Sequence, residues 1–137
     1  MASAIPAVKA AVLSTLSSAE DLEGVEVGAD LEPSRNSKYV WIWRAKSKRQ
    51  FKSVGARPPA LDEDVSLTLR VVVIGGEDPE TAVFEISDAV EAALRADLTL
   101  GGAVRWHRVE ELDQEPLQFD QKVGCHILMT LTARARI

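Results

Sequence analysis

Residues 64–106 contain the pattern that most constrains the fold of this chain: a strand, a helix and a second strand, joined by glycine turns. From Asp64 to Ile74, apolar residues alternate with Ser66, Thr68 and Arg70, which is the period of a half-buried strand. We therefore expect residues 64–74 to lie at the centre of a sheet. The side chains expected in its core are Val65, Leu67, Leu69, Val71 and Val73.

The residues after this strand carry a strong helix-start signal. Gly75 and Gly76 break the strand, and Asp78 followed by Pro79 is typical of an N-cap and the first helical position. Negative charge on Glu77, Asp78 and Glu80 favours the positive end of a helix dipole. Apolar residues then recur at spacings of three and four, which predicts an amphipathic helix packed on the sheet. That stripe consists of Val83, Ile86, Val90 and Leu94, and burial of each would contribute about 1.5–3 kcal/mol.

The other patterns complete an α+β fold. They predict a first helix over 4–18 and strands over 24–28, 38–44, 104–109 and 123–137. The basic segment 44–61 is interpreted as a long loop or protruding hairpin, and the acidic segment 110–120 as a solvated connector. We expect a mixed, mainly antiparallel sheet of about 4–5 strands with two helices packed on one face.

Length and composition limit the classes of protein that fit. A chain of 137 residues with 46% apolar content predicts one domain spanning 1–137. The formal charge of −5 argues against a general nucleic-acid binder, and the single Cys125 excludes an internal disulfide framework. Because no stretch approaches the roughly 18–20 apolar residues that cross a bilayer, we expect no membrane contact.

No motif predicts catalysis, a cofactor or a metal. Gly75–Gly76 lacks a P-loop lysine, and His107 and His126 are far apart in sequence. Cys125 and its neighbour His126 point to opposite faces of their predicted strand, which excludes a shared site. Four acidic residues lack the ligand spacing of a calcium loop and are expected to be solvated: Glu110, Glu111, Asp113 and Glu115.

The basic segment 44–61 is the strongest candidate for an interaction site. Three interpretations are open: a solvated loop, an electrostatic docking arm for an acidic protein surface, and a phosphate contact. The aromatic residues Tyr39, Trp41 and Trp43 precede it, and we expect them in the core or at a subunit contact rather than stacking on bases. The basic side chains are Arg44, Lys46, Lys48, Arg49, Lys52 and Arg57.

Nearly all of the chain resembles one protein family in the order of its segments and in their amino-acid sequences. An Ala-rich first helix precedes the strand Tyr39-Val-Trp-Ile-Trp43, a charged segment and Leu67-Thr-Leu-Arg-Val-Val-Val73. The helix running through Ala89 ends in Asp97-Leu-Thr-Leu-Gly-Gly102, and the last strand ends Thr132-Ala-Arg-Ala-Arg-Ile137. In these features the chain is similar to the tail terminator proteins of long-tailed bacteriophages, also called minor tail or tail completion proteins.

The resemblance implies a function in virion assembly. It implies an α+β protein that forms a homo-hexameric ring on the head-proximal end of the tail tube, stops tube polymerisation and joins tail to head. Its partners would be itself, the tail tube protein and the head-tail connector proteins, with genomic DNA passing through the lumen without specific binding. It would be assembled in the bacterial host cytoplasm and reside in the tail or neck of the virion. The basic segment would reach acidic tube or connector subunits, and Arg134 and Arg136 would lie at the lumen or a subunit boundary.

Two other functions remain open from the sequence. A head-side connector or completion protein also forms rings at the same junction. A small ferredoxin-like module, binding nucleic acid, has the same predicted layers, because helices on one face of an antiparallel sheet serve many functions. An enzyme is disfavoured because the sequence offers no positioned base, nucleophile or metal ligand set.

Overall fold

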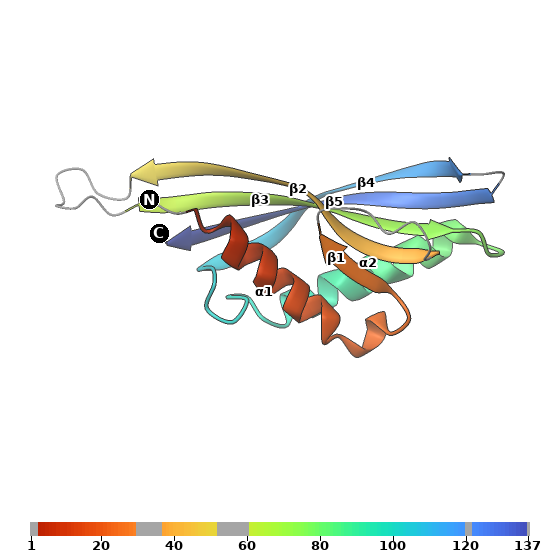
Figure 1. Cartoon of the computed structure of the whole chain (residues 1–137), viewed down its shortest axis with the longest axis horizontal. Coiled ribbons are helices and arrows are strands. Elements are labelled where there is room, and N and C mark those ends of the chain that lie inside the picture. Colours follow the sequence, from red (N-terminus) through yellow and green to blue (C-terminus); the bar gives the residue numbers. More distant parts are fainter. Residues whose placement is uncertain (1–2, 30–36, 52–60, 120–121, 137) are drawn as a thin grey trace.

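Two helices cover one face of a five-stranded sheet in the computed structural model (Figure 1). The structure describes residues 3–29, 37–51, 61–119 and 122–136. The helices are α1 (Ile5–Ser17) and α2 (Pro79–Arg95), with a 3-10 turn, η1 (Glu20–Leu22), after α1. The strands are β1 (Glu26–Ala29), β2 (Lys38–Phe51), β3 (Leu61–Ile74), β4 (Trp106–Phe119) and β5 (Lys122–Arg136). The predicted α+β class, with two helices on one face of the sheet, is confirmed.

The sheet is mixed and mainly antiparallel, as predicted. Its order is β1-β2-β3-β5-β4, so β3 lies in the middle. β1 runs parallel to β2, whereas β2–β3, β3–β5 and β5–β4 are antiparallel pairs. β1 pairs only with Tyr39–Ile42, the beginning of the much longer β2.

The core lies between the sheet and the helices. The five alternating residues of β3, from Val65 to Val73, are at most 2% exposed, as the sequence pattern predicted. The neighbouring strand β5 supplies a second row of buried side chains, which includes Ile127 and Met129. The helices cover these strands with the predicted apolar stripe of α2, which is Val83, Ile86, Val90 and Leu94, and with the buried residues of α1, which are Val8, Val12 and Leu16.

The two helices begin in different ways. At α2, the Asp78 carboxylate accepts hydrogen bonds from the Thr81 backbone N–H at 3.2 Å and from Thr81 Oγ1 at 2.6 Å, which confirms the predicted N-cap. At α1, the Ala4 backbone N–H donates instead to Oε2 of Glu63 on β3, at 3.1 Å. A buried carboxylate from the sheet therefore accepts a hydrogen bond at the N-terminus of the first helix, in place of an N-cap side chain.

The basic segment is a hairpin arm rather than a loop over its first part. β2 continues to Phe51 and β3 starts at Leu61, so 44–51 is strand, while 52–60 lies outside the described residues. Basic residues alternate here with Ala45 and Ser47, and pairing with β3 satisfies those backbone groups that face β3, which a free loop would leave to water. Of the two interpretations offered by the sequence, the hairpin is the correct one for 44–51.

The prediction of a solvated connector over 110–120 is wrong. β4 extends to Phe119 and pairs with β5 along its length, with a register shift between Val109 and Glu111. This shift leaves Glu110 as a bulge and breaks the alternation on which strand prediction depends. Acidic side chains are tolerated because β4 is an edge strand whose one face carries no helix.

Candidate protein interface

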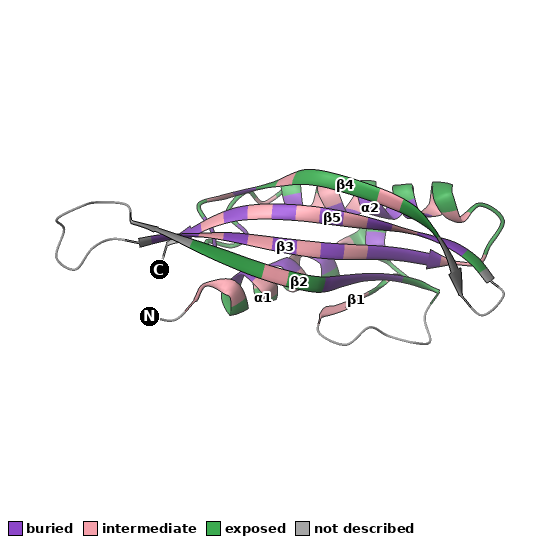
Figure 2. Cartoon of the chain, turned by 90° about the horizontal axis from the view of Figure 1, so that it is seen from above, coloured by how far each residue is buried: buried purple, intermediate pink, exposed green. Residues whose placement is uncertain are grey.

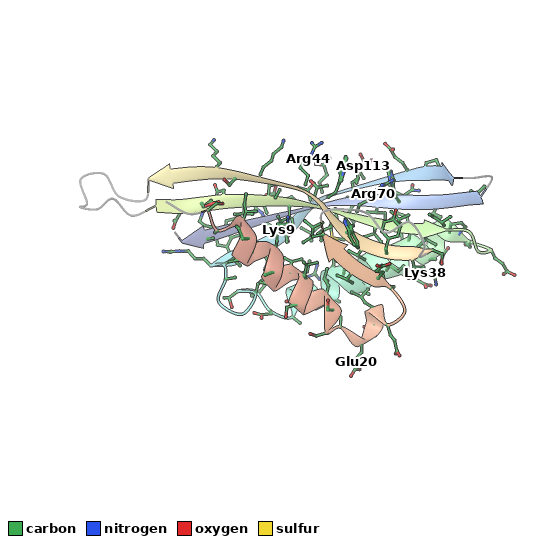
Figure 3. All side chains as sticks on the ribbon, in the orientation of Figure 1. Lys9, Glu20, Lys38, Arg44, Arg70 and Asp113 are labelled. Carbon is green, nitrogen blue, oxygen red and sulfur yellow. The ribbon has the colours of Figure 1, made fainter. Side chains whose placement is uncertain are left out.

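Three of the predicted basic side chains form a row on the face of the sheet opposite the helices, which we call the helix-free face. Arg44, Lys46 and Lys48 occupy alternate positions of β2 and are all exposed. Ala45, between them, packs against the core on the other face. Figure 3 shows Arg44 projecting from the helix-free face. We call Arg44, Lys46 and Lys48 the basic row.

The other predicted basic residues do not extend this row. Arg49 belongs to β2, but its side chain is outside the described set, as are all of Lys52 and Arg57. Arg136 ends β5 opposite Asp62, and its side chain is likewise not described. The predicted roles of these four residues at an interface therefore stay predictions.

Arg134 differs from the basic row because its own chain already binds it. Its Nε donates to Asp64 Oδ1 at 2.9 Å, and its Nη2 is 3.4 Å from Asp64 Oδ2. The Asp64 carboxylate raises the pKa of the Arg134 guanidinium, through hydrogen bonding first and charge attraction second. The guanidinium also lies over the Trp106 ring, 5.6 Å from its centroid. These contacts fix Arg134 within the sheet.

The structure adds an acidic row that sequence reasoning missed as a site. Glu111, Asp113 and Glu115 occupy alternate positions of β4, and all three are exposed. They share the helix-free face, since Gln114 between them points to the core side, where its Nε2 lies 3.4 Å from Cys125 Sγ. Figure 3 shows Asp113 on the same side of the sheet as Arg44. The alternation of acids with Leu112 and Gln114 was the signal that could have revealed a strand here.

The two rows lie on opposite edges of the sheet. Beyond Ile42, no described residue pairs with the outer edge of β2, and none pairs with the outer edge of β4. Figure 2 shows exposed residues along β4 and along the middle of β2, with β3 and β5 between them more buried. Unpaired strand edges offer rows of backbone N–H and C=O groups to another chain.

The aromatic residues of β2 divide between core and surface. Tyr39 and Trp41 are 5% and 8% exposed and pack with Val72, which excludes a base-stacking platform made of all three aromatic residues. Trp43 lies at the β2 register shift and is 50% exposed, with the Arg44 guanidinium 4.9 Å from its ring centroid. The edge of β2 therefore presents an indole stacked with a cation.

The two histidines lie in hydrogen-bond contacts that connect elements of the fold, and the cysteine is buried. His107 Nε2 lies 2.8 Å from the Asp97 carbonyl oxygen and joins β4 to the turn after α2. Cys125 is buried, while His126 faces the other side of β5 and accepts a hydrogen bond from Arg70 Nε at 3.1 Å. This arrangement confirms that Cys125 and His126 point apart. Within the described ranges, no three His, Cys, Asp or Glu side chains are grouped to bind a metal, and no helix has the length and apolarity to span a bilayer.

Comparison with known proteins identifies a shared fold. This chain is similar to a solved structure described as "Virion of native gene transfer agent (GTA) particle", with a TM-score of 0.60 and 14% sequence identity, covering 100% of each chain. No protein-family model and no curated protein sequence matches it. At this identity the likeness concerns the fold, which the two chains share over their full lengths.

Proposed function

We propose that this chain is a structural protein of a phage-like virion, and specifically a tail terminator. It forms a ring on the head-proximal end of the tail tube, ends tube polymerisation and provides the surface that joins the tail to the head. The observation that carries the proposal is the full-length fold likeness to a chain from a virion particle. The similarity of sequence segments to tail terminator proteins supports the more specific role.

The shape of the sheet suits ring formation. A head-to-tail contact joins two different surfaces of one molecule, and it closes into a ring when the rotation between copies fits. Here the two surfaces are the outer edge of β2 beyond Ile42 and the outer edge of β4, which lie on opposite sides of the sheet and pair with no described residue. Occupying the tube end would remove the surface onto which the next tube subunit adds, so the proposed role needs geometry and no catalysed reaction.

The proposal is tested by the mass of the purified protein and by its position on tail tubes. We expect light scattering after size exclusion to find rings of about six copies, formed on their own or on tubes. Electron microscopy of tubes mixed with the protein should show density at one end only. Tubes without the protein, which should grow to uncontrolled lengths, are the control.

Other outcomes would favour the alternatives. Rings that bind isolated heads but leave tube ends bare would indicate a head-side connector or completion protein. A monomer that ignores tubes and binds DNA with an affinity that falls steeply as salt rises would indicate a nucleic-acid-binding module.

A further inference from the structure

We infer that the ring closes by pairing the basic row on β2 of one copy with the acidic row on β4 of the next copy. This inference rests on the proposed ring and names its subunit interface. The three pairs are Arg44 with Glu115, Lys46 with Asp113, and Lys48 with Glu111 of the neighbouring copy.

The spacing of the two rows matches residue for residue. Each row has three charges at alternate positions of a strand, and both rows lie on the helix-free face. Going across the sheet, every neighbouring pair from β2 to β4 is antiparallel, so β2 and β4 run in opposite directions. A β2 laid beside the β4 of another copy in the same orientation therefore continues the antiparallel sheet. Side chains directly opposite in such a pair have Cβ atoms about 4.5–5.5 Å apart, close enough for three salt bridges.

Four of the six charges in the two rows have no partner in the described part of their own chain. Lys46, Lys48, Glu111 and Asp113 form no ion pair or side-chain hydrogen bond with any residue that the structure describes. Elsewhere the chain pairs its charges, as in Arg108 with Glu110 at 2.8 Å. Glu115 already lies 3.4 Å from His126 Nε2, and Arg44 lies over the Trp43 ring. The four charges without a partner among the described residues are therefore the ones most available to a second copy.

No residue that the structure describes pairs with the outer strand edges beside the two rows. β1 covers the edge of β2 only as far as Ile42, two positions before the basic row begins. On β4, Pro116 follows the acidic row directly and has no backbone N–H to donate, which suits the end of a paired segment. Among the described side chains, each edge also exposes a large apolar residue: Trp43 is 50% exposed and Leu112 is 43% exposed.

The register of this pairing is compatible with closure. Within one chain, Arg44 is level with Glu111, because Arg44 pairs with Thr68, Thr68 with Thr130, and Thr130 with Glu111. The proposed joint places Lys48 level with Glu111 instead, an offset of 48 − 44 = 4 positions over the four long strands of one copy. The offset is therefore one residue per strand, which is about 3.3 Å along the strand for each strand spacing of about 4.8 Å. This ratio corresponds to a tilt of about 35° between the strands and the ring axis, which is within the range of closed barrels.

Charge reversal on the two rows tests the joint by complementation. We expect Lys46→Glu/Lys48→Glu and Glu111→Lys/Asp113→Lys each to prevent ring formation, because like charges would then face each other. An equal mixture of the two variants should form rings in which they alternate, since every joint again brings opposite charges together. The matched control is Glu85→Lys/Asp88→Lys, which makes the same change of charge on exposed α2 positions and should leave rings intact.

A cysteine pair gives a direct test of register. β3 and β5 lie between Lys46 and Asp113 within one chain, so their Cα atoms are at least about 14 Å apart across the sheet, whereas a disulfide needs Cα atoms within about 7 Å. Any disulfide in Lys46→Cys/Asp113→Cys must therefore join two copies, and mild oxidation should give a ladder of species that ends at the ring. Lys46→Cys/Glu85→Cys, with its second thiol on the helix side, should give no ladder.

The outcomes separate this interface from the proposed function. Normal rings from both charge-reversal variants, or a folded mixture that fails to assemble, would overturn the interface while the ring itself stands. If Lys46→Glu/Lys48→Glu forms normal rings that fail to join tails, the basic row contacts the tube or the connector, as the sequence predicted, and not the neighbouring copy. A wild-type protein that forms no ring, alone or on tubes, would contradict the proposed function and the interface with it.

Discussion

Glu63 is the residue whose burial has the clearest consequence for stability. Its carboxylate is 0% exposed and accepts hydrogen bonds from the Ala4 backbone N–H and Ser3 Oγ, at the start of α1. Replacement by alanine would leave these donors without their acceptor, so Glu63→Ala should lower the free energy of unfolding by about 1–3 kcal/mol. Urea denaturation measures this change. Glu85→Ala on exposed α2 should change it by less than about 0.5 kcal/mol, and equal effects of the two variants would contradict the anchoring role.

Asp78 predicts how stability depends on acid. Hydrogen bonds from the Thr81 side chain and backbone N–H hold the pKa of the Asp78 carboxyl below its usual value. A carboxyl with a lowered pKa in the folded state contributes stability above its unfolded pKa, and this contribution is lost as pH falls through the folded pKa. Asp78→Asn keeps a capping oxygen without a titrating group.

The stability difference between wild type and Asp78→Asn should therefore shrink as the pH falls below the usual aspartate value of about 3.9. Thermal unfolding followed by circular dichroism at stepped pH measures this difference. A constant difference over the acid range would show that Asp78 titrates no differently in the folded and unfolded protein.

At the scale of elements, the pairing of β3 with β5 holds the centre of the sheet and depends on Gly124. A Cβ at this position would clash with the Val73 carbonyl oxygen and lie 3.1 Å from Ile74 Cα. Because these are backbone atoms, the strands would have to move apart, and Gly124→Ala should destabilise the fold by about 1–3 kcal/mol. Chemical denaturation measures the loss. Val123→Ala is the neighbouring control, since Val123 is 63% exposed, and a loss as large as that of Gly124→Ala would argue against the steric explanation.

The elements that could be predicted are those whose own residues carry the signal. β3 has an uninterrupted alternation, and α2 has a cap, a proline and an apolar stripe, so each was identified without knowledge of its neighbours. The second half of β2 and most of β4 have charged faces, and their strand conformation comes from pairing with β3 and β5, which lie far away in sequence. Long-range pairing of this kind leaves little trace in a local pattern.

The sequence predicted only the part of the candidate site that local composition reveals. The accumulation of Lys and Arg from Arg44 onward identified the basic row from composition alone. The charge of Arg134 favours an interface role, but no local pattern shows that Asp64, on a distant strand, forms an ion pair with it. The acidic row was missed because its alternation only matters once β4 is known to be an edge strand.

For the whole molecule, assembly through exposed charge rows predicts a ring that dissociates as salt rises. Each exposed ion pair is worth about 0–1 kcal/mol and is weakened by screening, whose length falls from about 10 Å at 0.1 M salt to about 3 Å at 1 M. Size exclusion with light scattering, from about 0.05 M to about 1 M NaCl, should therefore show rings giving way to smaller species.

The chain in which Lys46, Lys48, Glu111 and Asp113 are all reversed provides the decisive comparison. In this variant the reversed positions of β2 are acidic and those of β4 are basic, so opposite charges still face each other at every joint. It should therefore form rings with nearly the same salt dependence as the wild type. Rings that become more stable at high salt would instead indicate an interface dominated by apolar contacts, for which the exposed Trp43 and Leu112 side chains are the available anchors. Such a result would leave the edges as the contact surface but assign its strength to the apolar residues rather than to the charge rows.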